Sequence, residues 1–184
     1  MLKSKHLELV PLTYEEIVVL QKSRAELETL KGWTISAQWI DADYKQEIED
    51  AFGYWLPQTA ANPEHYIWFT AWEIILTEKN LAIGAIGFMG LPNQFGETMV
   101  GYHIDKNYQK KGFATEALNC LLHWAFQNKD LKAVIADTLF ENPASHKVLQ
   151  KNGFLFAGES KEEDIHVWQW KLFRENFFQI NQNF

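Results

Sequence analysis

A loop between a strand-like segment and a strongly periodic helix constrains the fold of this 184-residue chain more than any other feature. Residues 100–104 are mostly apolar, and residues 109–117 follow with the sequence QKKGFATEA. Apolar side chains then recur at the 3.6-residue period of a helix, at Ala114, Ala117, Leu118, Leu121, Leu122, Ala125 and Phe126. This order predicts a strand, a tight loop and a helix in direct succession.

The loop has the properties of an anion-binding site. Gly112 permits dihedral angles that a Cβ would forbid, and it lets the backbone approach a ligand closely. The helix that follows presents unpaired N–H groups and the positive end of its dipole at the same place. Lys110 and Lys111 could add positive charge, although two solvated loop lysines are an equal alternative. An ordinary strand-to-helix turn without a ligand would also explain this pattern.

A second segment, residues 142–154, reads as a short helix with clear ends. Asn142 is a favourable N-cap, and Pro143 occupies the first helical position, where its missing N–H costs nothing. Asn152 and Gly153 form a typical helix stop. A short apolar strand, residues 133–138, precedes this helix. The predicted order is therefore strand, anion loop, helix, strand, short helix and strand.

These two segments resemble the motifs of the GNAT superfamily of N-acetyltransferases, nearest the branch of ribosomal-protein alanine acetyltransferases. Residues 109–114 resemble motif A, [Gln/Arg]-x-x-Gly-x-[Gly/Ala], and residues 142–154 resemble motif B, Asn-x-x-Ser followed by Lys-x-Gly-Phe. The resemblance covers roughly residues 7–174, with Val10 in place of a common Arg. It implies an α+β GNAT fold, in which a mixed, mostly antiparallel sheet has a splayed parallel strand pair and helices on both faces.

The resemblance also implies an activity and a co-substrate. In the family, motif A holds the pyrophosphate of acetyl-CoA, and the strand before it bonds the pantetheine arm and polarises the acetyl carbonyl. An amine then attacks the thioester directly, and no metal is needed. The residues expected to bind acetyl-CoA are Tyr102, His103, Ile104, Gln109, Lys110, Lys111, Gly112, Phe113, Ala114, Thr115, Asn142 and Ser145.

Ser145 is the expected partner of the leaving sulfur. It matches the motif B serine that hydrogen-bonds the coenzyme sulfur in the alanine-acetyltransferase branch. Many other members use a tyrosine four residues later, and that residue is Leu149 here. The alternative is that Asn142 and Ser145 only cap the short helix.

Two glutamates are candidates for the general base. Glu97 lies on the strand that leads into motif A, where the family often carries acids, although the position two residues later is Met99. Glu73 shares a predicted strand face with apolar residues, which would raise its pKa toward the range that a base needs. A glutamate at a strand end in water is the alternative for Glu73.

The acceptor is expected to be a primary amine. At pH 7 about a tenth of an α-amino group with a pKa near ~8 is neutral, against about one lysine in ~2,500. A site without a strong base therefore favours the N-terminus of a protein or peptide. A small amine, such as a polyamine, an amino acid or an antibiotic, is one alternative, and a non-catalytic acyl-CoA-binding regulatory module is another. The side chains that could line the acceptor wall, or simply pack, are Trp33, Trp39, Tyr54 and Trp55.

Charge and composition argue against several other classes of protein. A formal charge of −7 and a pI of about 5.4 argue against a general nucleic-acid binder. No apolar run approaches the ~18 residues of a membrane span, and the first residues lack a signal-peptide core. Cys120, the single cysteine, is expected to pack and fits a reducing cytoplasm. The six histidines show no metal-ligand spacing, and we expect a cytoplasmic monomer or homodimer.

The remaining segments complete one expected domain, residues 1–184. N-terminal helices within residues 13–62 are expected on the acceptor side, and the motif core spans residues 66–173. Gly84 and Gly87 are expected to permit close packing of their strand. The predicted elements are helices over 14–30 and 40–55, a loop over 57–63, strands over 66–76, 81–89, 155–157 and 165–173, and a frayed end from about 176.

Overall fold

The computed structural model describes residues 1–36, 42–162 and 165–181 and contains one eight-stranded sheet. The strands lie in the order β1-β2-β3-β4-β5-β6-β8-β7. They are β1 (Leu2–Lys3), β2 (Leu7–Pro11), β3 (Trp72–Leu76), β4 (Leu81–Phe88), β5 (Glu97–Ile104), β6 (Ala133–Leu139), β7 (Leu155–Glu162) and β8 (Ile165–Phe173). The α-helices are α1 (Tyr14–Lys22), α2 (Arg24–Lys31), α3 (Ala42–Ala61), α4 (Phe113–Ala125), α5 (Pro143–Lys151) and α6 (Arg174–Asn181). Short 3₁₀ turns lie at Tyr66–Trp68, Thr77–Lys79 and Lys106–Tyr108.

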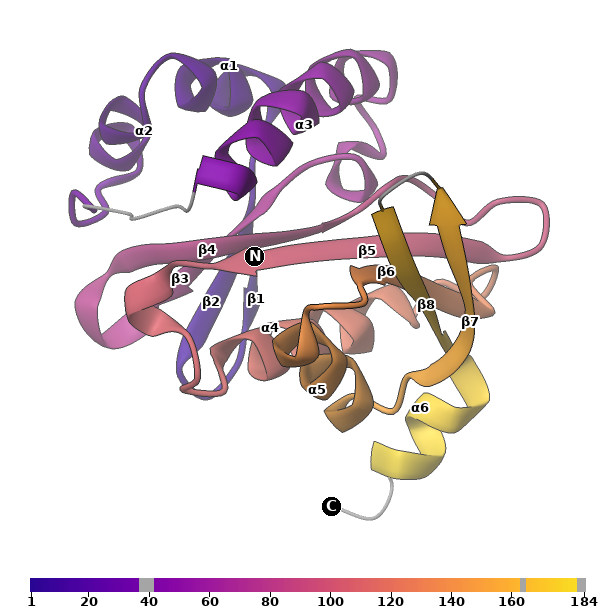
Figure 1. Ribbon diagram of the computed structural model, residues 1–184. Coiled ribbons are helices and arrows are strands. Elements are labelled where there is room, and N and C mark those ends of the chain that lie inside the picture. The colour runs from indigo at the N-terminus through magenta and orange to yellow at the C-terminus, as the bar shows by residue number, and fades with distance from the viewer. Residues whose placement is uncertain (37–41, 163–164, 182–184) are drawn as a thin grey trace.

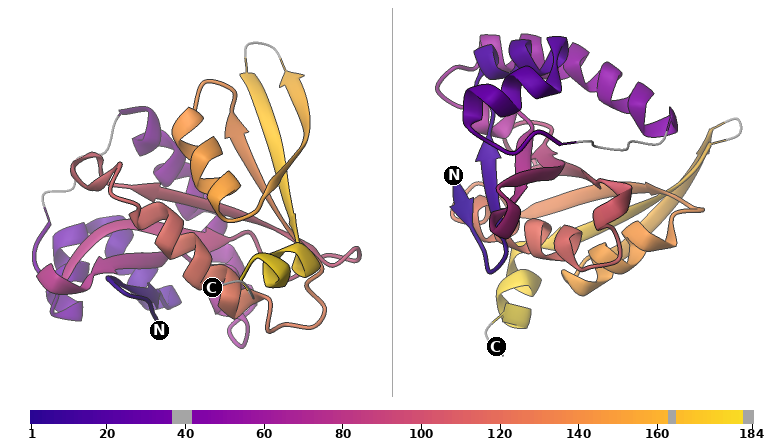
Figure 2. Two further views of the ribbon diagram at one scale, coloured as in Figure 1. Left: turned by 90° about the horizontal axis from the view of Figure 1, so that it is seen from below. Right: turned by 90° about the vertical axis from the view of Figure 1, so that its left-hand side faces the viewer.

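Helices cover both faces of the sheet, as Figure 1 shows, with α1, α2 and α3 on one side and α4 and α5 on the other. Among the described strands, β5 and β6 are the one parallel pair. They pair only where Glu97–Met99 of β5 meets Ala133–Ile135 of β6. Beyond this point β5 stays with β4, while β6 stays with β8, and the strands diverge (Figure 2). The expected mixed sheet with a splayed parallel pair is confirmed.

The apolar stripe of α4 is buried against the sheet, as its period predicts. Leu118, Leu121 and Leu122 are fully buried, and Trp124 packs on Trp68 and Trp72 with ring centroids 4.8 and 5.1 Å apart. A second, smaller core lies under the N-terminal helices and consists of Leu12, Ile17, Leu27 and Phe52. The sheet therefore separates two apolar layers, each with its own helices.

The single helix predicted over residues 14–30 is two helices. Ser23 breaks it, because its backbone is extended (φ −161°, ψ 120°) and its hydroxyl accepts a hydrogen bond from the N–H of Glu26. Ser23 is thus the N-cap of α2, the role that serine favours over a helix interior. The break turns α2 so that Arg24 and Glu28 face the sheet.

The predicted end of the next helix at Trp55 is also wrong, because α3 continues through Pro57 to Ala61. Proline removes one intrahelical hydrogen bond. Phe52, Trp55 and Leu56 pack in the second core, and this packing holds the helix on the N-terminal side of the proline. In the described part of the chain, no helix combines the length and apolar content that crossing a bilayer requires.

The strand predicted over 66–76 is shorter than its composition suggests. Residues 66–68 form a 3₁₀ turn, and β3 begins only at Trp72. The indole N–H of Trp72 donates to the carbonyl of Ile67 (2.8 Å), and the N–H of Gly90 donates to the carbonyl of Trp68 (2.8 Å). These two bonds occupy the carbonyls of Ile67 and Trp68, which a continuous strand would have paired in the ladder.

The C-terminal part of the chain is more ordered than predicted. Strand β7 extends to Glu162, not to residue 157, because it pairs with β8 along its length. The segment from residue 174 to 181 is helix α6, where a frayed end was expected. Phe177 anchors this helix, because it is fully buried and packs against Phe126 with 5.2 Å between ring centroids. Residues 182–184 lie outside the described chain.

Gly84 sets how closely β4 approaches β5. A Cβ at this position would lie 2.2 Å from the carbonyl oxygen of His103 and 3.0 Å from the Cα of Ile104. Both are backbone atoms, which cannot move without displacing β5. A Cβ at Gly87 would similarly lie 2.6 Å from the carbonyl oxygen of Thr70. The expectation that these glycines permit close packing is confirmed.

We predict that Gly84→Ala lowers the free energy of unfolding by about 1–3 kcal/mol, because the added methyl group overpacks the strand pair. Urea denaturation followed by circular dichroism measures this change. Gly53→Ala is the matched control, because a Cβ at Gly53 in α3 meets nothing within 4 Å. The control should raise stability by roughly 0.5–1 kcal/mol through helix propensity. Equal stability of Gly84→Ala and wild type would contradict the proposed close approach.

Candidate active site

A cavity of about 680 Å³ lies where the N-terminus of α4, the N-terminal half of α5 and the end of β5 meet. Both sequence motifs contribute to its wall. Of the residues predicted to bind the coenzyme, all except Lys111 line it: Tyr102, His103, Ile104, Gln109, Lys110, Gly112, Phe113, Ala114, Thr115, Asn142 and Ser145. The volume is in the usual range of about 300–1,000 Å³ for small-molecule and cofactor sites. We call it the coenzyme cavity, after the ligand that the sequence resemblance implies.

The loop before α4 is shaped to bind an anion with its backbone. Lys110 and Gly112 both have positive φ angles, 61° and 88°, so successive N–H groups turn toward one side. Side chains of Thr13, Ser23 and Asn142 cap α1, α2 and α5, whereas the N-cap of α4 is Gly112, which has no side chain to offer. A Cβ on Gly112 would meet nothing within 4 Å, so the space in front of this helix end is open.

The main chain of β5 presents polar groups to the splayed gap. The N–H of Asp105 donates to the carbonyl of Ile83 on β4 (2.8 Å). Alternate residues of an antiparallel strand bond the same neighbour. The main-chain groups of His103 therefore face β4, and those of Tyr102 and Ile104 face the side where β6 has moved away. Of the three residues predicted to bond a ligand through their backbone, Tyr102 and Ile104 are the ones so placed, and the carbonyl of Ile104 accepts a hydrogen bond from the side chain of Gln109 (2.9 Å).

Helix α5 closes the other side of the cavity. Its N-cap Asn142 accepts a hydrogen bond from the N–H of Ser145 (3.1 Å), so the predicted cap is present. The hydroxyl of Tyr102 donates to the carbonyl of Ser145 (3.4 Å) and links β5 to α5. At the other end of α5, the amide of Asn152, 3% exposed, donates to the carbonyl of Thr115 (3.3 Å). The two motifs are therefore braced against each other.

Lysines give the coenzyme cavity a positive wall in a chain of net charge −7. Lys106, Lys110, Lys147 and Lys151 line it, and Asp105 is the acid among the described lining residues. The Asp105 carboxylate already accepts a hydrogen bond from the N–H of Asn107 (2.7 Å). Several cations around one acid favour a polyanionic ligand.

Sequence reasoning missed Lys147 and Lys151. They are four residues apart on α5 and so share one helix face, and this spacing was the available signal. Lys111, which the sequence did single out, turns elsewhere. Its ammonium donates to the carbonyl of Asn107 (3.0 Å) and lies 5.0 Å from the ring centroid of Tyr108.

A second cavity of about 140 Å³ lies on the opposite face of the sheet, under the N-terminal helices. Glu73, Ala85 and His103 form its floor. They are paired in register across β3, β4 and β5, so their side chains project from the same face. The short side chain of Ala85 leaves open space between its two neighbours. The other lining residues are Leu20, Arg24, Phe52, Trp55 and Ala71. We call it the helix-side cavity.

Glu73 is fully buried and ion-paired, so the alternative of a solvated glutamate is wrong. The guanidinium of Arg24 donates to both carboxylate oxygens of Glu73, at 3.0 and 2.9 Å. Burial alone would lower the pKa of Arg24, but the charges of Glu73 and Glu28 outweigh it and raise that pKa. Arg24 therefore carries a charge that neutralises the candidate base.

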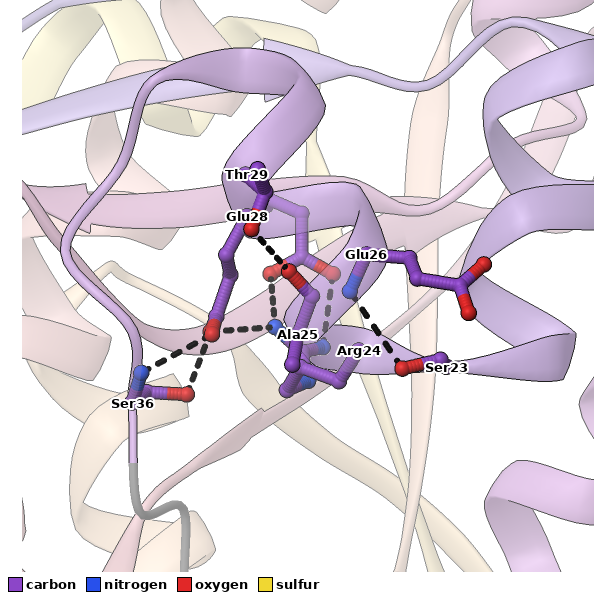
Figure 3. A network of polar contacts seen from close by, with 8 residues as sticks. Ser23, Arg24, Ala25, Glu26, Glu28, Thr29 and Ser36 are labelled. Carbon is purple, nitrogen blue, oxygen red and sulfur yellow. Dashed lines mark hydrogen bonds and ion pairs between the residues drawn. The ribbon is translucent and has the colours of Figure 1, made fainter.

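A second buried carboxylate, Glu28, lies 3.7 Å from Nη1 of Arg24, the nitrogen that also donates to Glu73. Glu28 also accepts hydrogen bonds from the N–H (2.8 Å) and the hydroxyl of Ser36, and Figure 3 shows this network. The network connects β3, α2 and the segment after Trp33. It fixes the guanidinium in position, because each of its neighbours is itself held.

His103 is half-buried on the helix side of β5, and its Nε2 atom is buried without a hydrogen-bond partner within the described chain. Burial lowers the pKa of His103 to about 4, although the nearby charges of Glu73 and Asp105 act to raise it and that of Arg24 acts to lower it further. The imidazole is therefore neutral at physiological pH. Of the described residues, His103 alone borders both cavities.

Glu97 is not among the described residues that line either cavity. Glu97 begins β5, seven residues before Ile104, which is about 24 Å along an extended strand. Its carboxylate pairs with the ammonium of Lys171. This placement favours a structural ion pair over the role of base.

The four aromatic residues proposed for the acceptor wall lie in different surroundings. Trp55 lines the helix-side cavity, and both Trp33 and Trp55 pack against the second core. Tyr54 is half-buried, and Trp39 lies outside the described residues. Cys120 packs against the main core, and burial raises the pKa of its thiol, which disfavours a nucleophilic role.

Comparison with known proteins gives consistent matches. The family model described as the acetyltransferase (GNAT) domain matches residues 6–155. The uncharacterized N-acetyltransferase YjdG of Bacillus subtilis is 24% identical over 131 residues, which are 71% of this chain and 75% of that protein. The ribosomal-protein-serine acetyltransferase of Escherichia coli is 29% identical over 92 residues, about half of each protein.

Solved structures share the fold at low sequence identity. The ribosomal-protein-S5-alanine acetyltransferase from Vibrio fischeri has a TM-score of 0.66 and 20% identity, covering 95% of this chain and 97% of that one. Mutant forms of a spermidine/spermine N-acetyltransferase from Vibrio cholerae also have a TM-score of 0.66, with 16% identity, and cover 97% and 99%. At these identities the structural likeness establishes the fold alone.

We predict that Gly112→Glu weakens coenzyme A binding roughly 100-fold or more, because a carboxylate would replace open space and oppose an anion at close range. Isothermal titration calorimetry measures the dissociation constant, and circular dichroism confirms folding. Lys111→Glu is the control. It changes the charge by two units at the adjacent residue, outside the cavity wall, and should weaken binding less. A folded Gly112→Glu variant with wild-type affinity would show that this loop does not hold the ligand.

Proposed function

Since this chain belongs to the GNAT family of acetyltransferases, we propose that it transfers the acetyl group of acetyl-CoA to the α-amino group of a protein or peptide. Membership makes the chain an N-acetyltransferase, and the family uses acetyl-CoA as acetyl donor. The kind of acceptor and the roles of individual residues are the parts that we infer.

The coenzyme cavity fits acetyl-CoA by charge and by shape. The open N–H groups at the start of α4 would hold the diphosphate, with Lys110 beside them. Lys147 and Lys151 on α5 would add charge along the same wall. The backbone of Tyr102 and Ile104, in the gap between β5 and β6, would bond the pantetheine arm. The bound thioester is the acetyl donor.

Ser145 is the side chain that we assign to the leaving sulfur. It lies on the first turn of α5, at the wall of the coenzyme cavity opposite β5. Its N–H is bonded to Asn142 and its carbonyl to Tyr102, so its backbone is held from two sides. A hydroxyl on a main chain held in this way could hydrogen-bond a developing thiolate without movement of the backbone.

The observation that carries the acceptor assignment is the neutralised carboxylate in the helix-side cavity. Of the described residues that line this cavity, Glu73 is the acid, and Arg24 already occupies both of its oxygens. The remaining wall is largely apolar, with Leu20, Phe52 and Trp55. A polyamine carries several ammonium groups, and each one buried would need an anionic partner. A single amino end suits this cavity better.

The names of the similar proteins give two different kinds of acceptor. One acts, by its name, on ribosomal-protein serine, and another on spermidine or spermine. An α-amino group loses its proton more readily than a polyamine or lysine nitrogen, which favours it in a site without a free carboxylate. A small amine is the second candidate, and a panel of acceptors separates the two.

We predict that the purified protein acetylates a peptide with a free α-amine about 100-fold faster, in kcat/KM at pH 7, than Nα-acetyl-lysine or spermidine. The ratio follows from the larger neutral fraction of the α-amine. Release of the coenzyme A thiol, followed by absorbance with a disulfide reagent, measures the rate. A peptide with a blocked N-terminus is the control. A preference for spermidine would overturn the proposed acceptor class.

We predict that Ser145→Ala lowers kcat about 10- to 100-fold, the equivalent of one hydrogen bond to a charged group. The affinity for acetyl-CoA should change little, since the loop before α4 remains intact. Steady-state kinetics and calorimetry measure the two quantities separately. Ser160→Ala, on the exposed strand β7, is the control and should leave both unchanged. An unaltered kcat in Ser145→Ala would remove this hydroxyl from the mechanism.

A further inference from the structure

We propose that the imidazole of His103 is the proton acceptor for the attacking amine of an acceptor whose amino end lies in the helix-side cavity. The inference deepens the proposed function and rests on it for the identity of the two substrates. Three independent features carry it: the position of His103 between the two cavities, its unpartnered Nε2 atom, and the charges that surround it.

The position is the first feature. The backbone of β5 faces the splayed gap and the coenzyme cavity at Tyr102 and Ile104, and the side chain of His103 projects from the other face, toward the N-terminal helices. An acceptor that entered from the helix side would meet His103 before it reached the acetyl group. Within the described chain no other residue borders both cavities.

The unpartnered atom is the second feature. A buried polar atom without a hydrogen bond costs roughly 1–3 kcal/mol, and native proteins rarely leave one without a functional reason. The Nε2 atom of His103 is such an atom. The small side chain of Ala85, next to it on β4, leaves space on the same face of the sheet. An amine N–H in this space would satisfy the nitrogen.

The surrounding charges are the third feature. Glu73 on β3, Arg24 on α2 and Asp105 at the end of β5 are the charged groups that act on His103. Glu28 on α2 acts through Arg24. Two of the groups that act on His103 are carboxylates and one is a guanidinium, so their charges together favour a proton on the imidazole. Burial acts in the opposite direction and lowers the pKa to about 4, so the resting imidazole is neutral and can accept a proton.

The acetyl transfer needs no reactant other than the thioester and the amine, with His103 as the proton acceptor. The neutral amine nitrogen forms the new C–N bond to the acetyl carbon, and the thioester C–S bond breaks with its electron pair on sulfur. Forming the C–N bond makes the nitrogen cationic and its proton far more acidic, so a base of low pKa can take it. The proton moves to Nε2 of His103 and leaves through solvent to the released thiolate. The products are the acetylated amine and coenzyme A.

The carboxylates considered from the sequence are less suitable for this step. Glu73 lines the helix-side cavity, but Arg24 holds both of its oxygens. Glu97 is at the far end of β5 and pairs with Lys171. Glu73 is therefore a positioning residue, because its charge acts on the imidazole of His103 and not on the substrate.

The test compares His103→Gln and His103→Ala with wild type, using whichever acceptor of the panel the wild type acetylates fastest. We expect kcat to fall about 100-fold or more in both variants, the contribution that general base catalysis makes. The affinity for coenzyme A should stay within about threefold, because the side chain lies on the other face of the sheet. His166→Gln, on strand β8 beside Glu159, is the matched control and should retain wild-type kcat.

Two readouts separate proton transfer from a structural role. Added imidazole should restore activity to His103→Ala, which leaves space for it, and should not stimulate wild type. In His103→Gln the rate should rise with pH without a plateau, as hydroxide replaces the missing base, whereas the wild type should level off above the pKa of the acceptor. Glutamine fills similar space, so a fold defect would appear in melting temperature and coenzyme affinity.

Wild-type kcat in a folded His103→Gln variant would overturn the inference. So would a lowered kcat that imidazole fails to restore and whose pH profile matches wild type. The proposed function fails by a different result, namely that the fastest acceptor in the panel is not an α-amine. The variants are assayed with the fastest acceptor of any class. The role of His103 can therefore be tested even if the proposed acceptor class is wrong.

Discussion

The divergence of β5 from β6 is the constraint on which the rest of this structure depends. Two neighbouring strands that stop pairing expose main-chain N–H and C=O groups, which normally must find partners. Here β5 keeps β4 on one side, and the close approach at Gly84 secures that pairing. The opposite side of β5 remains open between α4 and α5. The opening brings the loop at Gly112 and the first turn of α5 to a single cavity.

The buried ion pair of Arg24 and Glu73 has the corresponding role on the other face. A carboxylate inside an apolar layer is costly unless a cation and hydrogen bonds compensate it. Arg24 supplies that compensation from α2, where Glu28 pairs with the same guanidinium, and the break at Ser23 places Arg24 at the start of this helix. The same pair docks the helix layer onto the sheet beside His103, whose buried Nε2 atom has no hydrogen-bond partner in the described chain.

Local signals in the sequence predicted much of the coenzyme side. The stripe of α4, the cap at Asn142 and the glycine loop each depend on residues within one or two helical turns, so pattern alone reveals them. The lysines at 147 and 151 could have been found from their shared helix face. The ion pair could not, because Arg24 lies 49 residues before Glu73 and no local pattern connects them. Strand β3 was overextended because apolar composition does not distinguish a strand from a buried 3₁₀ turn.

The sequence by itself determined the two motifs and the loop that faces the coenzyme cavity, because turn chemistry, capping and periodicity act over short spans. The mixed sheet with its splayed strands was expected only from the family that these motifs resemble. Only the tertiary structure decided what the buried polar residues do. Whether a glutamate is a free base or half of an ion pair, and whether a histidine is on the surface or between two cavities, depends on groups that the fold brings together from distant parts of the chain. Burial and charge act through space, so their effect on Glu73 and His103 could not be read from neighbours in sequence.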